Sequence, residues 1–198
     1  MEKKRRYRMA ERAKAQEKTR EKIVEATMHL HEEIGPRATT ISAIAERAGV
    51  QRLTVYRYFP DETAVFQACT SYWLSLNPPP DAESWSGVKA PWQRFRTALM
   101  AFYAYYAETQ RMWSAAHRDV ADVPALQGPM AEFKAFVEMI GDDLAKSLRN
   151  SPKSADNLRH TIQHALAFPT WADLEHRGLG DRQKVTLVEQ WLAGIIKG

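Results

Sequence analysis

Residues 39–62 read TTISAIAERAGVQRLTVYRYFPDE, and this stretch decides the fold. Apolar residues recur at helical spacing through Ile41–Ala48, and Thr40 precedes them as a residue whose side chain can cap a helix N-terminus. A second apolar pair, at residues 55 and 59, marks another short helix. Gly49 lies between the two segments, where the chain must turn sharply and glycine takes a left-handed backbone at low cost. The stretch therefore predicts a helix-turn-helix.

The outward side of the second helix carries donors and flat rings. No acidic residue lies between Gln51 and Pro60, whereas a helix that faces only water usually mixes acidic and basic side chains. Guanidinium groups, hydroxyls and phenols suit phosphate oxygens and the edges of bases. A polar surface helix without a partner is the alternative reading. The side chains in question are Gln51, Arg52, Thr54, Tyr56, Arg57 and Tyr58.

A resemblance to a known family follows from the run T-x-x-x-I-A-x-x-A-G-V-x-x-x-T-V-Y-x-Y-F, at Thr40 through Phe59. This run resembles the DNA-binding signature of tetracycline-repressor (TetR) family transcription regulators. The resemblance implies an all-α homodimer with an N-terminal three-helix DNA-binding domain and a C-terminal helical ligand-binding and dimerisation domain. We expect these domains at residues 1–62 and 63–198, with a basic arm at 1–18 and the helix-turn-helix at about 40–59.

The resemblance also implies which residues contact DNA. Base contacts are expected from the second helix, and backbone or nearby base contacts from the start of the first helix. Arg57 lies on the same outward side, and Tyr58 matches a phosphate-contacting position. Two departures weaken the match: Gln51 stands where many members have a Ser cap, and Glu62-Thr63 replaces a Lys-Glu pair. The expected DNA-contacting residues are Thr40, Ser42, Gln51, Arg52, Leu53, Thr54, Tyr56, Arg57 and Tyr58.

The positive charge of the chain lies in its first third. Residues 1–70 hold 14 Lys and Arg against 10 Asp and Glu, whereas residues 71–198 hold 14 of each. This asymmetry predicts a polyanionic partner, of which nucleic acid is the first candidate. The first residues form either a solvated tail or a basic arm that follows phosphates. Too few apolar side chains accompany them for binding at a membrane surface.

Composition bounds the remaining possibilities. The chain has 198 residues, of which 44% are hydrophobic, so it can bury a core. No apolar run reaches the roughly 18 residues of a membrane span, and no signal segment follows the first residues, so we expect a cytoplasmic protein. Cys69 is the sole cysteine. We interpret it as a small buried residue, with redox sensing as the alternative.

Outside the helix-turn-helix, helical periodicity continues to the end of the chain. A first helix is expected at 19–34, ending at Gly35-Pro36, and the 154–176 segment should bend at Pro169. A proline-rich loop at 78–91 interrupts the pattern, and breaks are expected near Pro124 and Gly128-Pro129. The further expected helices cover residues 61–77, 91–110, 112–117, 130–149, 154–176 and 181–196.

Catalytic motifs are not evident, so we do not expect an enzyme. The sequence has no Gly-rich phosphate loop, no nucleophile elbow and no Cys/His cluster at metal spacing. His160 and His164 lie four apart, but a bare pair without a third ligand is weak support for a metal. We therefore expect no metal and no cofactor.

The second half of the chain is rich in aromatic residues, which favours a small-molecule pocket over a plain bundle core. Core packing is the alternative for each residue. The candidate pocket residues are Phe102, Tyr106, Trp113, His117, Phe136, Met139, His164, Phe168 and Trp171. The last helix has an apolar stripe too wide for one neighbour, which predicts a subunit interface. Its candidate residues are Leu187, Val188, Trp191, Leu192 and Ile195.

The sequence thus predicts a sequence-specific DNA-binding transcriptional regulator. The expected mechanism is a homodimeric repressor that binds a near-palindromic operator on double-stranded DNA and leaves it when an unknown small-molecule effector binds. The alternative is a helical small-molecule-binding protein or enzyme without a DNA-binding role.

Overall fold

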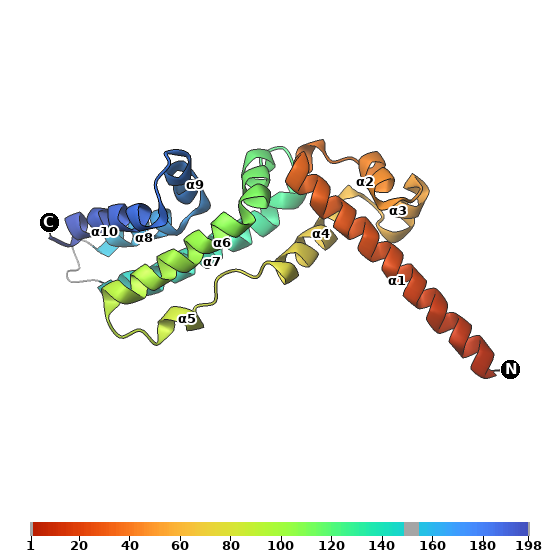
Figure 1. Ribbon diagram of the computed structural model, residues 1–198, viewed down its shortest axis with the longest axis horizontal. Coiled ribbons are helices and arrows are strands. Elements are labelled where there is room, and N and C mark those ends of the chain that lie inside the picture. Colours follow the sequence, from red (N-terminus) through yellow and green to blue (C-terminus); the bar gives the residue numbers. More distant parts are fainter. Residues whose placement is uncertain (1, 149–154, 198) are drawn as a thin grey trace. The chain divides into compact units, whose positions relative to one another are not determined.

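The computed structural model describes residues 2–148 and 155–197, and within them the regular structure is entirely helical (Figure 1). The chain forms two compact units. The first contains residues 1–77 and 114–129, and the second contains residues 78–113 and 130–198. The expected all-α fold is confirmed.

The first unit begins with the long helix α1 (Glu2–Glu33), followed by a 3-10 turn, η1 (Pro36–Ala38). The short helices α2 (Ile41–Ala48) and α3 (Arg52–Tyr58) come next, and α4 (Glu62–Leu76) closes this part of the chain. Helix α1 packs against both α2 and α4, as Figure 1 shows. Their buried apolar side chains form one core, to which α3 contributes Val55 and the following Phe59.

Two local predictions about helix ends, at Thr40 and Gly49, are confirmed, and the structure adds a cap at Asp61. The Thr40 hydroxyl accepts a hydrogen bond from the Ala43 N–H at 3.2 Å and so caps α2. Gly49 has φ +66°, in the left-handed region that glycine favours, where the chain turns into α3. Asp61 Oδ1 accepts a hydrogen bond from the Ala64 N–H at 2.8 Å and caps α4.

Helix α1 is longer than the periodicity predicted. The apolar stripe begins at Ile23, but the helix already runs from Glu2. Side chains from Arg6 to Lys18 are exposed, so no packing pattern marks this half of the helix in the sequence. Residues 2–18 of the basic arm are therefore helical, and the side chains of residues 1–5 lie outside the description.

The second unit contains a short helix, α5 (Glu83–Ser86), and most of the long helices α6 (Pro91–Asp119) and α7 (Pro124–Leu148). Helix α8 (Ala155–Leu166) packs against α9 (Phe168–His176) and α10 (Asp181–Lys197). The core of this unit is strongly aromatic, with Trp85, Phe95, Tyr106 and Trp171 almost fully buried.

Three predicted boundaries in helices α6 to α9 are wrong. Helix α6 continues through the break expected after residue 110, since residues 92–119 contain neither Gly nor Pro. Helix α7 runs through Gly128-Pro129. The 154–176 segment divides at Ala167, whose backbone is extended, instead of bending at Pro169. Proline fits the first turn of α9 there because its missing N–H would have no intrahelical partner.

The compact units do not test the expected functional boundary at residue 62, which stays a prediction. Helix α4 belongs to the first unit, where Val65, Phe66 and Cys69 join the core around α1. The end of α6 and the start of α7 belong to the same unit.

None of the helices in residues 2–148 and 155–197 combines the length and the apolar character that crossing a bilayer would require.

Candidate nucleic-acid interface

One side of α3 is buried in the core of the first unit, and the other side is exposed. Val55 is fully buried and Phe59 is 3% exposed, and both pack into the core formed by α1, α2 and α4. On the other side Leu53 is 78% exposed, and Tyr56 is 44% exposed. The anchoring of α3 through its inner side fixes the direction of its outer side chains.

The predicted DNA-contacting residues lie on the accessible surface of the first unit. Thr40, Ser42, Gln51, Arg52, Leu53, Tyr56 and Arg57 are exposed, whereas Thr54 and Tyr58 are half-buried. The first unit thus brings all of them to α2, α3 and the turn between these helices. Whether they contact DNA stays a prediction.

Two basic residues near α3 form ion pairs with acidic side chains, whereas the basic residues of α3 form none with the described residues. Arg47, on α2, forms a two-bond ion pair with Glu33, and this hydrogen bond lowers the pKa of the Glu33 carboxyl. Arg37 forms an ion pair with Asp122 at 2.9 Å. Arg57 instead lies over the Tyr58 ring, with its guanidinium carbon 5.4 Å from the ring centroid. Because no ion pair among the described residues neutralises Arg57, its charge is available to an anion.

Both departures from the family pattern have structural counterparts. Gln51 precedes α3 without a side-chain hydrogen bond to the helix N-terminus, as expected for a weak cap. Glu62 occupies the first turn of α4 and is exposed. A carboxylate stabilises a helix N-terminus, yet at this position it cannot supply the phosphate contact of a lysine.

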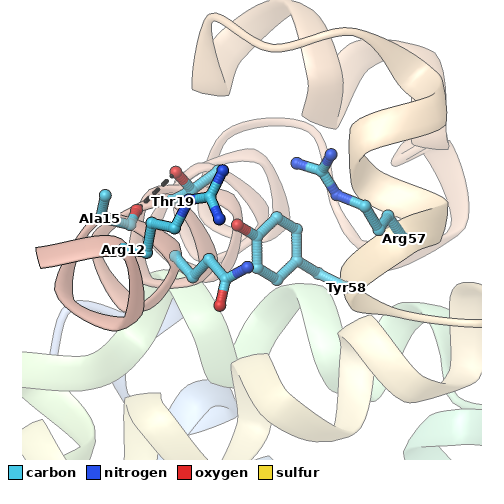
Figure 2. Close-up of a pocket in the computed structure, with 6 residues that line it drawn as sticks. Arg12, Ala15, Thr19, Arg57 and Tyr58 are labelled. Atoms are coloured by element: carbon cyan, nitrogen blue, oxygen red, sulfur yellow. Dashed lines mark hydrogen bonds between the residues drawn. The ribbon is translucent and has the colours of Figure 1, made fainter. Parts of the chain in front are cut away.

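The structure adds residues to the candidate interface that were not predicted from the sequence. Arg12, Ala15, Gln16 and Thr19 line a cleft together with Arg57 and Tyr58, as Figure 2 shows. Arg12, Gln16 and Thr19 follow a spacing of four and three, so they share one side of α1. This spacing could have predicted that the three residues share one side of a helix. It could do so only if α1 was known to begin before Arg12.

Most of the predicted pocket residues lie in one aromatic cluster inside the second unit. Tyr106 is at its centre, with ring centroids 5.4 Å from Phe168, 6.0 Å from Trp171 and 6.1 Å from Trp113. The Tyr106 hydroxyl donates to the Leu166 carbonyl at 2.9 Å, and burial raises the pKa of this phenol well above 10. Phe102 and Phe136 extend the cluster. Phe133 belongs to it as well, 4.2 Å from Trp113, and the sequence reading missed it.

Three of the predicted pocket residues do not join this cluster. Met139 is 59% exposed and His164 is exposed, because each lies about 120° around its helix from the buried stripe. His117 belongs to the first unit, where it is half-buried, and burial lowers its pKa. The aromatic rings fill the interior with contacts to one another, so a ligand site there stays a prediction.

The predicted interface residues on α10 divide into two sets. Val188 and Leu192 are fully buried within their own unit, where α10 packs on α8, and are therefore unavailable to a second subunit. The sequence could not separate them from their neighbours because the apolar stripe is wide on both flanks. Leu187, Trp191 and Ile195 remain half-buried.

Comparisons with known proteins agree with this architecture. The family described as "Bacterial regulatory proteins, tetR family" matches residues 23–69, which run from the apolar part of α1 into α4. The tetracycline repressor protein class C of Escherichia coli is 31% identical over 88 residues, covering 42% of this chain. The match spans only 40% of that repressor's length.

Solved structures extend the likeness to the whole fold. A TetR-like transcriptional regulator from Rhodococcus sp. RHA1 has a TM-score of 0.64 at 18% identity, covering 91% of this chain and 96% of its own. NalD, described as the secondary repressor of the MexAB-OprM multidrug efflux pump in Pseudomonas aeruginosa, has a TM-score of 0.59 at 22% identity, covering 92% and 97%.

The anchored, outward-facing α3 and the helical second unit together give the chain the fold of TetR-like structures. Residues 23–69 match the TetR family of bacterial regulatory proteins, and the fold of the chain resembles that of TetR-like structures.

Proposed function

We propose that the protein is a homodimeric, sequence-specific DNA-binding repressor that a small-molecule effector releases from its operator. The observation that carries this proposal is the outer side of α3. Leu53 and Tyr56 are exposed there beside the exposed Arg52, with no acidic residue along the helix. A helix presenting guanidinium, phenol and apolar groups matches the donors, acceptors and thymine methyl groups of a major groove.

Each subunit would insert its α3 into the major groove. In a two-fold dimer the two helices enter successive grooves about 34 Å apart, so the operator is a near-palindrome of two half-sites. Arg52 suits a guanine edge, and Tyr58 suits a phosphate. The basic first third of the chain would supply the non-specific attraction, which weakens as salt rises.

Dimerisation would use the half-buried side of α10. Leu187 lines a shallow groove on this helix together with Arg182, Gln183, Thr186 and Gln190. A second groove on the same unit is lined by Trp92 and Ala193 among polar residues. Apolar side chains framed by polar ones fit a subunit interface with a polar rim.

Release would follow from linkage. An effector that binds more tightly to a dimer with another spacing of its α3 helices depopulates the DNA-bound form, and DNA weakens effector binding by the same factor. The aromatic cluster around Tyr106 is the candidate effector region, since rings pack well on flat apolar ligands. Helix α6 runs from that cluster to Asp119 in the first unit, which makes it the candidate connection.

Selection of bound sequences from random DNA duplexes by the purified protein tests the proposal. We expect enrichment of a near-palindrome and protection of the selected duplex by the purified dimer. We also expect Arg52→Ala to lose its base preference. A screen of small molecules by melting temperature would then find effectors that weaken binding to that duplex. A protein that stays monomeric and enriches no sequence at low ionic strength would refute the proposal.

A further inference from the structure

We propose that the cleft between α1 and α3 binds a phosphate of the DNA backbone, held between the guanidinium groups of Arg12 and Arg57. This inference rests on the proposed function and adds a contact outside the helix-turn-helix. It assigns a role to the part of α1 that precedes the core.

The cleft has the composition of an anion site. Its volume is about 430 Å³, and Figure 2 shows Arg12 from α1 and Arg57 from α3 facing the same space beside the Tyr58 ring. The lining includes two guanidinium groups, an amide and two hydroxyls, but no carboxylate. Guanidinium groups bind phosphate through paired N–H donors, so two of them on opposite walls can hold one tetrahedral anion.

The positive charge in the cleft is not neutralised by the protein. The ion pairs of the described residues involve neither Arg12 nor Arg57, in contrast to Arg37 and Arg47, which each have a carboxylate partner. Two cations that face one space repel each other, and an anion between them removes that repulsion. The contact of Arg57 with the Tyr58 ring holds one of the guanidinium groups beside the cleft.

The position of the cleft selects the DNA backbone as the source of the phosphate. Arg57 directly follows Tyr56 and lies one helical turn beyond Leu53, the most exposed apolar residue of α3. When these side chains enter a major groove about 12 Å wide, the phosphates along the groove edge come next to the C-terminal end of the helix. Arg8 lies one turn before Arg12 on the same side of α1, so the row of charge continues along the backbone.

The salt dependence of duplex binding tests this assignment. Arg12→Gln removes one proposed phosphate contact and should reduce the slope of log affinity against log salt by about 0.9. The ratio of wild-type to variant affinity should then fall by about 3.5-fold between about 50 and 200 mM salt, and equally for selected and random duplexes. Lys14→Gln is the matched control, because Lys14 is also exposed but lies about 160° around α1 from Arg12. Its slope should equal that of the wild type.

A duplex with a single neutral methylphosphonate linkage locates the contact. One position in each half-site should weaken the wild type and Lys14→Gln more than Arg12→Gln, in which Arg57 alone still contacts that phosphate. If the wild type selects an operator but Arg12→Gln keeps the full slope, or no linkage shows this pattern, the cleft assignment is wrong while the proposed function stands. A wild type that binds no duplex overturns both.

A melting-temperature experiment with inorganic phosphate tests whether the cleft instead binds a free phosphate ion. We expect millimolar phosphate, compared with chloride at equal ionic strength, to leave the melting temperature of wild type and Arg12→Gln equally unchanged. A stabilisation that Arg12→Gln abolishes would assign the cleft to a free phosphate and refute the DNA assignment.

Discussion

Asp119 accepts a hydrogen bond from the backbone N–H of Arg37 at 3.1 Å, which ties the last residue of α6 to the turn after α1. The Asp119 side chain is almost fully buried and also accepts two hydrogen bonds from the Arg118 guanidinium, at 2.8 and 3.1 Å. The hydrogen-bonded Asp119 carboxylate thus connects the end of α6 to the turn that precedes α2.

Loss of this carboxylate should destabilise the first unit. Asp119→Ala leaves the Arg37 N–H without its acceptor, and we expect the free energy of unfolding to fall by about 1–3 kcal/mol in chemical denaturation. Asp122→Ala is the control because it removes the exposed ion pair with the Arg37 side chain. That change should cost less than about 1 kcal/mol. Equal losses in the two variants would contradict the account.

The stabilisation from Asp119 should depend on pH. The hydrogen bond from Arg118, with a smaller contribution from the Arg37 N–H, lowers the pKa of Asp119 below its ordinary 3.8. A carboxyl with a depressed folded-state pKa stabilises the fold above the ordinary pKa, and this contribution is lost as pH falls through the folded-state value. The stability difference between wild type and Asp119→Ala should therefore be constant near pH 7 and shrink below pH 3.8. A constant difference down to about pH 2 would contradict it.

Gly35 should tolerate a side chain less well than Gly49. Both have positive φ, +91° and +66°, so each alanine variant strains the backbone by about 1–2 kcal/mol. A Cβ at Gly35 would also collide with the Arg118 guanidinium and the Asp119 carboxylate, whereas nothing lies within 4 Å at Gly49. We expect a larger loss of melting temperature for Gly35→Ala. Equal losses would show that Arg118 moves aside at no cost.

The two sides of α3 should respond to mutation in opposite ways. Val55→Ala removes fully buried methyl groups and should lower the free energy of unfolding by roughly 1–3 kcal/mol. Leu53→Ala should change stability by less than about 0.5 kcal/mol, because that side chain is exposed, but should weaken binding to the selected operator. Denaturation and duplex titration on the same samples separate these effects. A destabilised Leu53→Ala that binds normally would refute the assignment.

Cys69 should be chemically inert in the folded protein. Burial is the main cause that raises the pKa of its thiol to about 12, and the sulfur lies 3.7 Å from His31 Nδ1. Thiolate is the reactive form, so alkylation at neutral pH should occur only on unfolding. Labelling of the native protein as fast as of the denatured protein would revive Cys69 as a redox sensor.

Short-range signals made the helix-turn-helix predictable. Thr40, Gly49 and Asp61 act on backbone groups within four residues, so their roles are readable without the rest of the fold. Helix α7 is different, because Pro129 within it would ordinarily mark a break. Its first turns are fixed by packing, since Val123 and Ala125 contact the core of the first unit and Leu126 is buried. Such tertiary contacts leave no local mark.

The candidate site shows the same division. The exposed side of α3 follows from the spacing of Val55 and Phe59, which are buried as a pair. The cleft at Arg12 could not be predicted, because it needs α1 to remain helical through a stretch with no apolar side to mark it. The separation of Val188 from Leu187 on α10 likewise depends on where α8 packs.

Chemical interference on the selected duplex tests most directly whether α3 enters the major groove. Methylation of guanine N7 blocks the major groove, and methylation of adenine N3 blocks the minor groove. We predict that N7 methylation prevents binding at two clusters of guanines about 10 base pairs apart, and that Arg52→Ala loses this sensitivity. Interference from adenine N3 alone, or a single cluster of guanines, would contradict a pair of α3 helices in successive major grooves.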